Sequence, residues 1–191
     1  MRIIAGKHKG RTIAAPPGRD TRPTTDRVRE SVMSSLFSML DGFAGTRVLD
    51  AFAGSGAMGF EALSRGAASC VMNDEAPASR ATIERNRETL GYAPTVAKVS
   101  GTDILKRGLP AAGGPFDLVF LDPPYKTEAA DVLALVRRAF AAGVLDERAI
   151  VVYEHGLSLS DELAASQGLR IRAQKRYGKT HVTYLSTAVA E

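Results

Sequence analysis

The sequence predicts an open α/β sheet of seven strands, mostly parallel, with helices on both faces. Short apolar runs precede Asp50, Asp74, Asp122 and Glu154, and each has the length of a buried strand. Longer segments with helical signals separate these runs. The runs carry little internal polarity, which is typical of parallel strands covered on both faces. A ligand site in such a sheet lies outside the carboxyl ends of the strands, where these acidic residues stand.

The amino-terminal residues predict a small element of their own. Ile3-Ile4 and Thr12-Ile13 flank the turn-like residues 7–10, which favours a hairpin with cationic side chains. We therefore divide the chain into a basic hairpin extension, residues 1–23, and a main domain, residues 24–191. The main domain is expected to open with a helix, because Thr25 can cap it and Asp26 suits its positive end. The docking face of this helix is predicted from apolar residues at helical spacing: Val28, Val32, Met33, Leu36, Phe37 and Leu40.

Strands and helices then alternate along the main domain. Strands are predicted at 48–49, 71–72, 94–100, 118–121 and 150–153, and helices at 57–66, 76–91 and 128–142. Pro77 is acceptable in a first helical turn, and Gly143 ends the last of these helices. Two further strands, expected to be antiparallel, lie between Leu169 and Ser186 and turn at Tyr177-Gly178.

Length and composition exclude several classes of protein. A chain of 191 residues with 45% hydrophobic and 24% charged residues is typical of one globular domain. It has no apolar run of about 18 residues and no signal-peptide pattern, so a cytoplasmic location away from membranes is expected. Cys70 is the only cysteine, which excludes an internal disulfide framework and multi-cysteine metal sites. The three histidines have no zinc-site spacing, and no metal is expected.

The net charge of +4 is unevenly distributed along the chain. Residues 1–30 hold 8 Lys or Arg against 3 Asp or Glu, residues 31–169 hold 12 against 17, and residues 170–191 hold 5 against 1. An acidic body with two basic ends would attract a polyanion in a salt-dependent way, which makes nucleic acid the leading class of partner. Basic ends that only keep the surface soluble are the alternative.

The first chemical motif is a glycine-rich turn between a predicted strand and a predicted helix. Gly54, Gly56 and Gly59 follow Asp50 in the run DAFAGSGAMG. Glycine lets the backbone turn tightly and approach a ligand closely. The GxGxxG spacing alone also fits a dinucleotide pocket. A carboxylate at position 50 would repel a pyrophosphate, however, and it suits a cationic ligand such as the amino-acid part and sulfonium of S-adenosylmethionine.

Acidic residues follow the next two predicted strands. Asp74 can accept hydrogen bonds from both ribose hydroxyls of either cofactor, and Asp103 is placed to accept one from an adenine amino group. Each aspartate alone is equally well explained as a helix cap or a solvated loop residue. The recurrence of acids at successive strand ends favours ligand binding.

The second motif is Asp122-Pro123-Pro124-Tyr125, directly after an apolar strand. Two consecutive prolines stiffen the backbone, so a carbonyl at Asp122 or Pro123 can be a fixed acceptor. If this carbonyl and the Asp122 carboxylate each accept one N–H of an exocyclic base amine, the nitrogen lone pair is directed at a methyl donor. Tyr125 offers a face for stacking an extruded base. A strand-ending Pro-Pro turn with a packed tyrosine is the alternative.

Five segments together resemble one known family. They are MRIIAGKHKGR, TRPTTDRVRE, VLDAFAGSGAMGFEALSRGA, FDLVFLDPPY and VVYEH, and they span almost the whole chain. The sequence is similar to the RsmD-type methyltransferases, which use S-adenosylmethionine to methylate the exocyclic N2 of one guanine in small-subunit (16S) ribosomal RNA. The glycine motif and DPPY are shared with many amino-methyltransferases, whereas the opening segment and TRPTTDR are more specific to this family.

The resemblance implies a Rossmann-like class I methyltransferase fold and a role for each motif. Asp50, Gly54 and Gly56 would line the methionine side of the cofactor, Asp74 the ribose and Asp103 the adenine, and Phe52 would also bind the cofactor. Asp122, Pro123, Pro124 and Tyr125 would form the catalytic loop. The segment Asn73-Asp74-Glu75 departs from the family pattern, which leaves Glu75 as a second candidate for the ribose, with Asp74 favoured.

The implied partner is 16S ribosomal RNA within a small-subunit assembly particle, bound by a monomer. Cations of the amino-terminal region are expected to hold RNA phosphates: Lys7, Lys9, Arg11, Arg22, Arg27 and Arg29. The basic carboxyl-terminal strands would add Arg170, Arg172, Lys175, Arg176 and Lys179.

Other functions remain as alternatives at this point. One is a DNA methyltransferase acting on an exocyclic base amine, and another is an NAD(P)-dependent oxidoreductase built on the literal GxGxxG. A third is a catalytically silent RNA-binding module. A covalent cytosine methylation mechanism is disfavoured, because the cysteine it needs would be Cys70, which lies in a predicted buried strand.

Overall fold

The computed structural model describes residues 1–17, 26–111 and 113–188. These residues form two compact units, Met1–Thr102 and Asp103–Glu191. The boundary predicted at residues 23 and 24, together with Arg22 and Thr25, lies outside the described residues.

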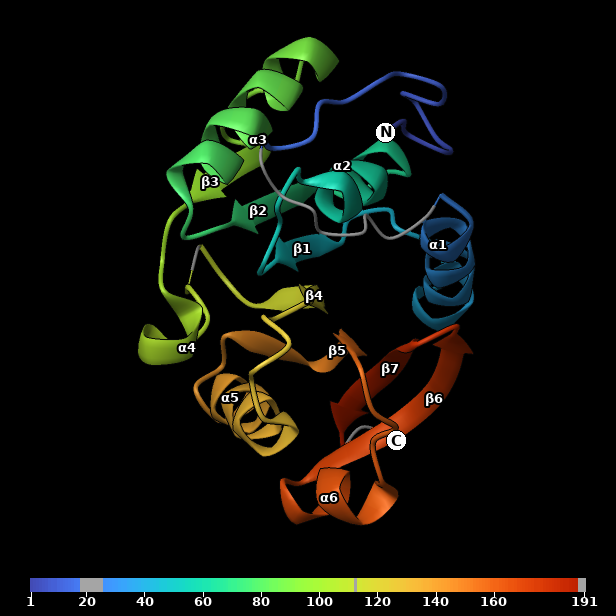
Figure 1. Ribbon diagram of the computed structural model, residues 1–191, viewed down its shortest axis with the longest axis vertical. Coiled ribbons are helices and arrows are strands. Elements are labelled where there is room, and N and C mark those ends of the chain that lie inside the picture. Colours follow the sequence, from blue (N-terminus) through green and yellow to red (C-terminus); the bar gives the residue numbers. More distant parts are fainter. Residues whose placement is uncertain (18–25, 112, 189–191) are drawn as a thin grey trace. The chain divides into compact units, whose positions relative to one another are not determined.

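The amino-terminal unit contains three parallel strands in the order β3-β2-β1. Their bounds are Arg47–Asp50 for β1, Ser69–Asn73 for β2 and Ala97–Ser100 for β3. Helix α1 spans Asp26–Leu40, α2 Ala57–Ser64 and α3 Pro77–Leu90. Helix α2 packs against β1 and β2, and α3 packs against β3 (Figure 1). Strands covered in this way need apolar side chains on both faces, which is why they were recognisable as apolar runs.

The buried face of α1 is narrower than the sequence predicts. Val32, Met33 and Leu36 are buried as expected, whereas Phe37 is 58% exposed. Because successive residues of a helix are about 100° apart, Phe37 lies at the edge of the face that Arg29, Met33 and Leu36 bury, and its ring remains largely in solvent. Arg29, on the buried side, is only 2% exposed.

The amino-terminal hairpin is held by backbone hydrogen bonds, with one bridge between Arg2 and Thr12 instead of two full strands. Ile3 N donates to Arg11 O over 2.9 Å, and Ile13 N donates to Met1 O over 2.9 Å. The side chains of Ile3 and Ile13 are buried. The predicted hairpin is therefore present, and its apolar residues belong to the core of the amino-terminal unit.

Helix α2 fixes the hairpin through polar groups. Both oxygens of the Glu61 carboxylate accept backbone N–H groups, from Ile4 over 2.8 Å and from Ala5 over 3.0 Å. Ser64 Oγ accepts the His8 N–H over 2.9 Å and donates to Ala5 O over 2.6 Å. Because the Glu61 side chain is 0% exposed, these bonds are shielded from water.

The carboxy-terminal unit contains four strands in the order β4-β5-β7-β6. Their bounds are Phe116–Leu121 for β4, Leu145–His155 for β5, Leu169–Tyr177 for β6 and Thr180–Thr187 for β7. Strands β4 and β5 are parallel, while β7 pairs antiparallel with both β5 and β6. The predicted antiparallel pair that turns at Tyr177-Gly178 is confirmed.

Three helices belong to the carboxy-terminal unit. Helix α5, Ala129–Ala141, packs on β5, and α6, Asp161–Ser166, packs on β6 (Figure 1). Helix α4, Ile104–Arg107, is a single turn. Neither α4 nor α6 is predicted from the sequence, because four and six residues are too few to show a helical period. Each is capped at its start by a side chain, that of Asp103 for α4 and that of Ser160 for α6.

The strand number and the mixture of strand directions agree with the predicted fold class. Parallel strands alternate with helices up to β5, and antiparallel β6 and β7 follow. The mixed sheet of seven strands is the one expected of the Rossmann-like fold that the family resemblance implies. Within the part of the chain that is described, no helix is long and apolar enough to cross a membrane.

Candidate active site

The glycine turn after β1 has the backbone conformation that the sequence predicts. Gly54 and Gly56 have φ angles of 56° and 77°, in the left-handed region that favours glycine. Gly56 also starts α2, and a Cβ on it would come within 2.8 Å of Met72 Sδ and of the Phe60 ring. The turn is therefore tight, and α2 lies close to β2 because no side chain intervenes.

The Asp50 carboxylate is buried beneath this turn. Its Oδ2 accepts the backbone N–H of Gly59 over 3.0 Å, within the first turn of α2. A carboxylate in this position is stabilised by the positive end of the helix. Its charge and the burial of Cys70 together raise the pKa of the Cys70 thiol well above its usual value, burial contributing most. Cys70 is therefore a protonated core residue in β2, as expected.

Asp74, directly after β2, connects two loops. Its Oδ2 accepts the N–H of Gly54 over 2.9 Å and its Oδ1 accepts the N–H of Ala76 over 2.9 Å. The side chain is buried, whereas Glu75 is exposed. Asp74 thus ties the glycine turn to the start of α3, and its carboxylate lies beside that turn. Since a carboxylate offers about four acceptor positions, these two bonds are compatible with binding hydroxyl groups as well.

Two asparagines, neither of them among the residues predicted from the sequence, position the same turn. Asn73 Nδ2 donates to Ala51 O over 3.1 Å and to Thr102 O over 3.0 Å, and Asn73 Oδ1 accepts the Thr102 N–H over 2.8 Å. Asn86 of α3 donates to Ser55 O over 3.0 Å. A polar residue at the end of an apolar strand, or at an apolar position of a helix, is the signal that could have identified both.

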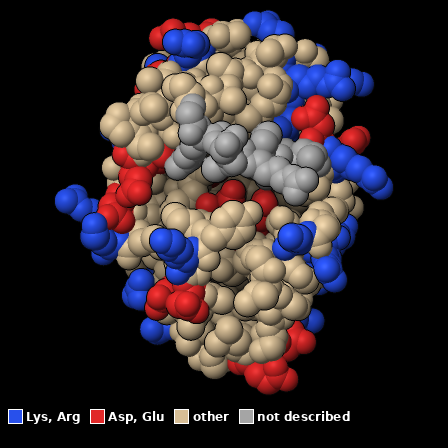
Figure 2. All heavy atoms as spheres, in the orientation of Figure 1, with Lys and Arg blue, Asp and Glu red and all other residues tan. Residues whose placement is uncertain are grey.

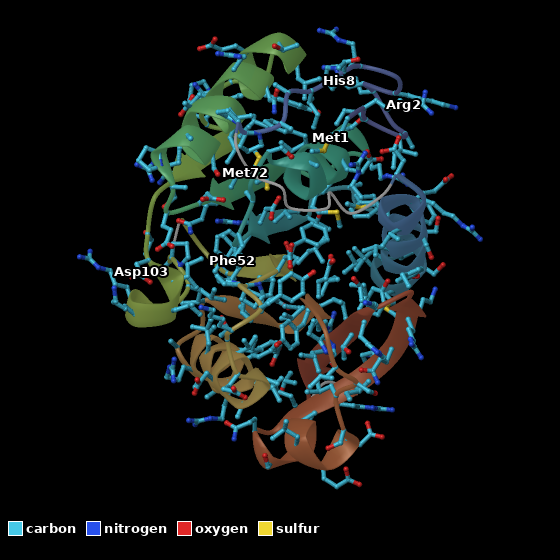
Figure 3. The ribbon with its side chains drawn as sticks, viewed as in Figure 1. Met1, Arg2, His8, Phe52, Met72 and Asp103 are labelled. Atoms are coloured by element: carbon cyan, nitrogen blue, oxygen red, sulfur yellow. The ribbon has the colours of Figure 1, made fainter. Side chains whose placement is uncertain are left out.

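Phe52 and Asp103 have different surroundings. Phe52 lies in the turn after β1 and is partly exposed (Figure 3). Asp103 caps α4 by accepting the Lys106 N–H over 3.2 Å, and it forms an ion pair with Lys106 Nζ at 2.9 Å. The hydrogen bond from the Lys106 side chain is the main reason that the pKa of Asp103 is lowered. The helix-cap alternative considered for Asp103 is therefore realised, and adenine binding would be an additional role.

The loop after β4 presents the second motif. Pro123 is buried, Asp122 is exposed and Tyr125 is 89% exposed. Pro124 O accepts the N–H of Thr127 over 2.8 Å, which closes a turn immediately after the motif. In the register of β4 and β5, Leu121 is paired with Tyr153, so Asp122 and Glu154 leave neighbouring parallel strands at the same edge. The loop thus places the Asp122 carboxylate, a proline-stiffened turn and the exposed ring of Tyr125 next to one another in the chain.

Four of the six amino-terminal cations predicted to hold RNA are exposed, namely Lys7, Lys9, Arg11 and Arg27. The five cations predicted in the carboxyl-terminal strands are exposed as well: Arg170, Arg172, Lys175, Arg176 and Lys179. The Arg11 guanidinium also donates to Thr89 O. Figure 2 shows Lys and Arg side chains projecting from the surface, with Asp and Glu among them. Arg22 lies outside the described residues.

Arg29 departs from the expectation that it contacts RNA. Its guanidinium is buried, donates to Arg2 O over 2.7 Å and pairs with Asp26 at 3.0 Å. A buried guanidinium cannot reach a phosphate, so Arg29 instead anchors the start of the chain to α1. Among the described residues, no group of three or more His, Cys, Asp or Glu side chains is arranged to hold a metal ion.

Comparisons with known proteins agree with this geometry. The family model described as "Conserved hypothetical protein 95" matches residues 1–186. The Bacillus subtilis protein "Putative rRNA methyltransferase YlbH" is 38% identical over 186 residues, which cover 95% of this chain and 96% of that protein. The "Ribosomal RNA small subunit methyltransferase D" of Escherichia coli is 37% identical over 128 residues, covering 66% of this chain and 61% of that protein.

A solved structure also covers nearly the whole chain. "Putative methyltransferase yhhF from Escherichia coli" superposes with a TM-score of 0.78 at 28% identity, over 98% of this chain and 97% of that one. The match of the family model to 186 of 191 residues and the near-complete coverage of the Bacillus relative lead to the same assignment. The chain belongs to this RsmD-like family of S-adenosylmethionine-dependent rRNA methyltransferases.

Proposed function

We propose that this protein transfers a methyl group from S-adenosylmethionine to the exocyclic N2 amine of a guanine in small-subunit (16S) ribosomal RNA. The observation that carries the proposal is the Asp122-Pro123-Pro124-Tyr125 loop at the end of the buried strand β4, in which Pro123 is buried while Asp122 and Tyr125 are exposed. The name of the Escherichia coli relative, a small-subunit ribosomal RNA methyltransferase, supports the small-subunit RNA as substrate. Such a substrate implies a cytoplasmic location.

The residues of the glycine turn fit the cofactor by their chemistry. Two buried carboxylates, Asp50 and Asp74, lie at the ends of adjacent parallel strands next to a turn of positive φ. Carboxylates attract a sulfonium and an ammonium group and accept hydrogen bonds from ribose hydroxyls, whereas they would repel a pyrophosphate. This chemistry argues against the oxidoreductase alternative. We propose that Asp50, Phe52, Gly54 and Gly56 hold the methionine portion.

The other cofactor contacts are assigned by the same reasoning. Asp74 would accept the ribose hydroxyls, since its carboxylate already lies beside the glycine turn, whereas Glu75 is exposed. Asp103 would accept a hydrogen bond from the adenine amine. The bound cofactor supplies a methyl group activated by a positively charged sulfur.

The catalytic loop would activate the acceptor amine. The lone pair of an exocyclic amine is delocalised into the base, so the nitrogen is a weak nucleophile until its geometry changes. Asp122 and a carbonyl of the proline segment would each accept one N–H, which directs the lone pair away from the ring. Asp122 would then take the proton that the nitrogen must lose once its new bond to carbon has formed. Tyr125 would stack on the base extruded from the RNA.

The test is methyl transfer to 16S rRNA, both naked and within small-subunit particles, and to duplex DNA, followed by mass spectrometry of the nucleosides. We expect N2-methylguanosine from RNA, with assembling particles the better substrate and the enzyme acting as a monomer. Asp122→Asn should still bind S-adenosylmethionine but turn over roughly two orders of magnitude more slowly. Asp161→Asn, an exposed residue of α6, is the matched control.

Three results would contradict the proposal. Methylation of DNA with none of RNA would favour the DNA alternative. Another methylated nucleoside would remove the assignment to guanine N2. Full turnover by Asp122→Asn would remove Asp122 from the mechanism.

A further inference from the structure

Three aromatic rings form a column in the carboxy-terminal unit. Tyr153 and His155 of β5 stack with ring centroids 4.5 Å apart and an interplanar angle of 23°. His155 and His181 of β7 continue the stack at 5.8 Å and 26°. Tyr153 is buried, while His155 and His181 are partly exposed. The column therefore runs from the core to the surface and reaches solvent at its His181 end.

The register of the sheet places a cation beside this exposed end. His155 is paired with His181 across β5 and β7, and His181 is paired with Arg176 across β7 and β6. Directly paired residues of antiparallel strands project from the same face. The guanidinium of Arg176 is exposed, and its Nε donates to Gly178 O over 2.8 Å, which keeps the side chain near the turn.

The middle ring of the column has a polar neighbour at each of its nitrogen atoms. His155 Nε2 lies 2.7 Å from Thr183 Oγ1, and His155 Nδ1 lies against Leu157 O. Thr183 Oγ1 donates to Gln174 Oε1 over 2.8 Å. Gln174 Oε1 also accepts the Leu159 N–H over 2.9 Å. The ring plane is thus fixed by the fold. The oriented ring of His155 is the surface on which His181 stacks, and a ring ordered by stacking binds a second planar group at a smaller cost in conformational entropy than a mobile side chain does.

We propose that this column, with Arg176 beside it, is a subsite for a nucleotide of single-stranded RNA. The base stacks on His181, and Arg176 binds its phosphate. The inference rests on the proposed function, because it assigns a place to an RNA nucleotide other than the guanine that is methylated. It adds a binding site on β5, β6 and β7 to the residues of the two sequence motifs.

The charges of β6 also have a purely structural explanation. Strand β6 is an edge strand of its unit, and charged side chains discourage edge strands from pairing with other chains. That explanation applies to Arg170, Arg172 and Lys175 as well as to Arg176. The protection of an edge strand does not account for the column of rings. Of the four cations, Arg176 is the one paired with His181, the ring at the outer end of the column.

The experiment compares two strands of equal length, a short single-stranded RNA and an abasic ribose-phosphate strand. Wild-type protein should bind the RNA more tightly, because only the RNA has bases to stack. His181→Leu, which removes the planar ring, should lower the affinity for RNA by about 5- to 10-fold and leave the affinity for the abasic strand unchanged. His181→Phe, which keeps a planar ring, should retain the affinity for RNA.

Salt dependence tests the cation. Arg176→Ala should weaken binding of both strands and reduce the slope of log affinity against log salt by about 0.7, the value for one phosphate of a single strand. Arg148→Ala is the matched control, because Arg148 is an exposed cation of β5 far from the column along that strand. It should change neither the RNA affinity nor the slope.

The outcomes separate this inference from the proposed function. If the wild-type protein methylates 16S rRNA and His181→Leu binds RNA and the abasic strand as the wild type does, the stacking subsite is refuted and the proposed function stands. If the wild-type protein neither binds nor methylates RNA, both fail. If His181→Leu and His181→Phe lose RNA affinity equally, a contact specific to the imidazole, and not stacking, holds the RNA.

Discussion

The Glu61 carboxylate provides the sharpest test of how the amino-terminal hairpin is held. Glu61→Gln leaves one oxygen acceptor for two backbone donors, those of Ile4 and Ala5, and turns an NH₂ group toward the second donor. It also removes the charge that pairs with Arg65 at 2.8 Å. A hydrogen bond to a charged group contributes about 1.5–3 kcal/mol, so the variant should lose roughly 2–4 kcal/mol.

Amide hydrogen exchange measures this loss locally. The Ile4 and Ala5 amides should exchange about 30- to 700-fold faster, since each 1.4 kcal/mol is a factor of about ten. The melting temperature should fall by about 4–16 °C, because about 1 kcal/mol corresponds to about 2–4 °C in a chain of this size. Glu88→Gln, an exposed residue of α3, is the control for charge and should change neither quantity. Wild-type exchange of the two amides in Glu61→Gln would refute the reasoning.

Three further predictions concern Asn73, Gly6 and His8 of the amino-terminal unit. Asn73→Ala removes three hydrogen bonds at the ends of β1 and β3 and should lower the free energy of unfolding by about 2–4 kcal/mol in urea titrations, and an unchanged midpoint would contradict this. Gly6→Ala places a Cβ 1.9 Å from Ser64 O at a φ of +81°, so a protease should cut within residues 1–17 faster than in the wild type. Gly10→Ala is the control, because its φ of +83° is similar but its Cβ would have no atom within 4 Å. The protease should cut Gly10→Ala more slowly than Gly6→Ala. The pKa of His8 is lowered from 6.5, mainly by burial and also by two neighbouring cations. As the pH falls, the histidine of the unfolded chain therefore takes up its proton before that of the folded chain. The free energy of unfolding should decrease as the pH drops below 6.5. His8→Phe should reduce that fall in urea titrations at several pH values, and an unaltered pH dependence would exclude His8 as its source.

Much of the fold could be predicted because parallel strands buried on both faces consist of short, uninterrupted apolar runs. The apolar runs before Asp50, Asp74 and Asp122 each became a strand, and the helices between them began and ended within a few residues of their predicted bounds. The single-turn helix α4 and the six-residue helix α6 were missed, because their stability comes from a cap and from packing and not from a periodic pattern.

The site motifs could be located from the sequence, but their neighbours could not. The positive φ of Gly54 and Gly56 and the exposed Tyr125 follow from residue type and position. Arg29 was expected at the surface because arginines usually lie there, yet it pairs with a backbone carbonyl more than twenty residues away. The role of Asn86 likewise depends on contacts with Ala14 and Ser55, which only the folded chain brings together.

The way in which the first seventeen residues dock bears on how this protein can be dissected experimentally. Asn86 exchanges two hydrogen bonds with the backbone of Ala14, and Glu61 receives two from Ile4 and Ala5. Deleting this segment would remove these four hydrogen bonds together with the buried side chains of Ile3 and Ile13, at a cost of several kcal/mol. If a shortened enzyme failed to bind RNA, the cause would therefore be loss of its folded structure and not loss of an RNA contact. Single charge changes at the exposed Lys7 or Lys9 isolate what the segment does for the substrate, whereas a change at Arg11 would also remove its hydrogen bond to Thr89 O.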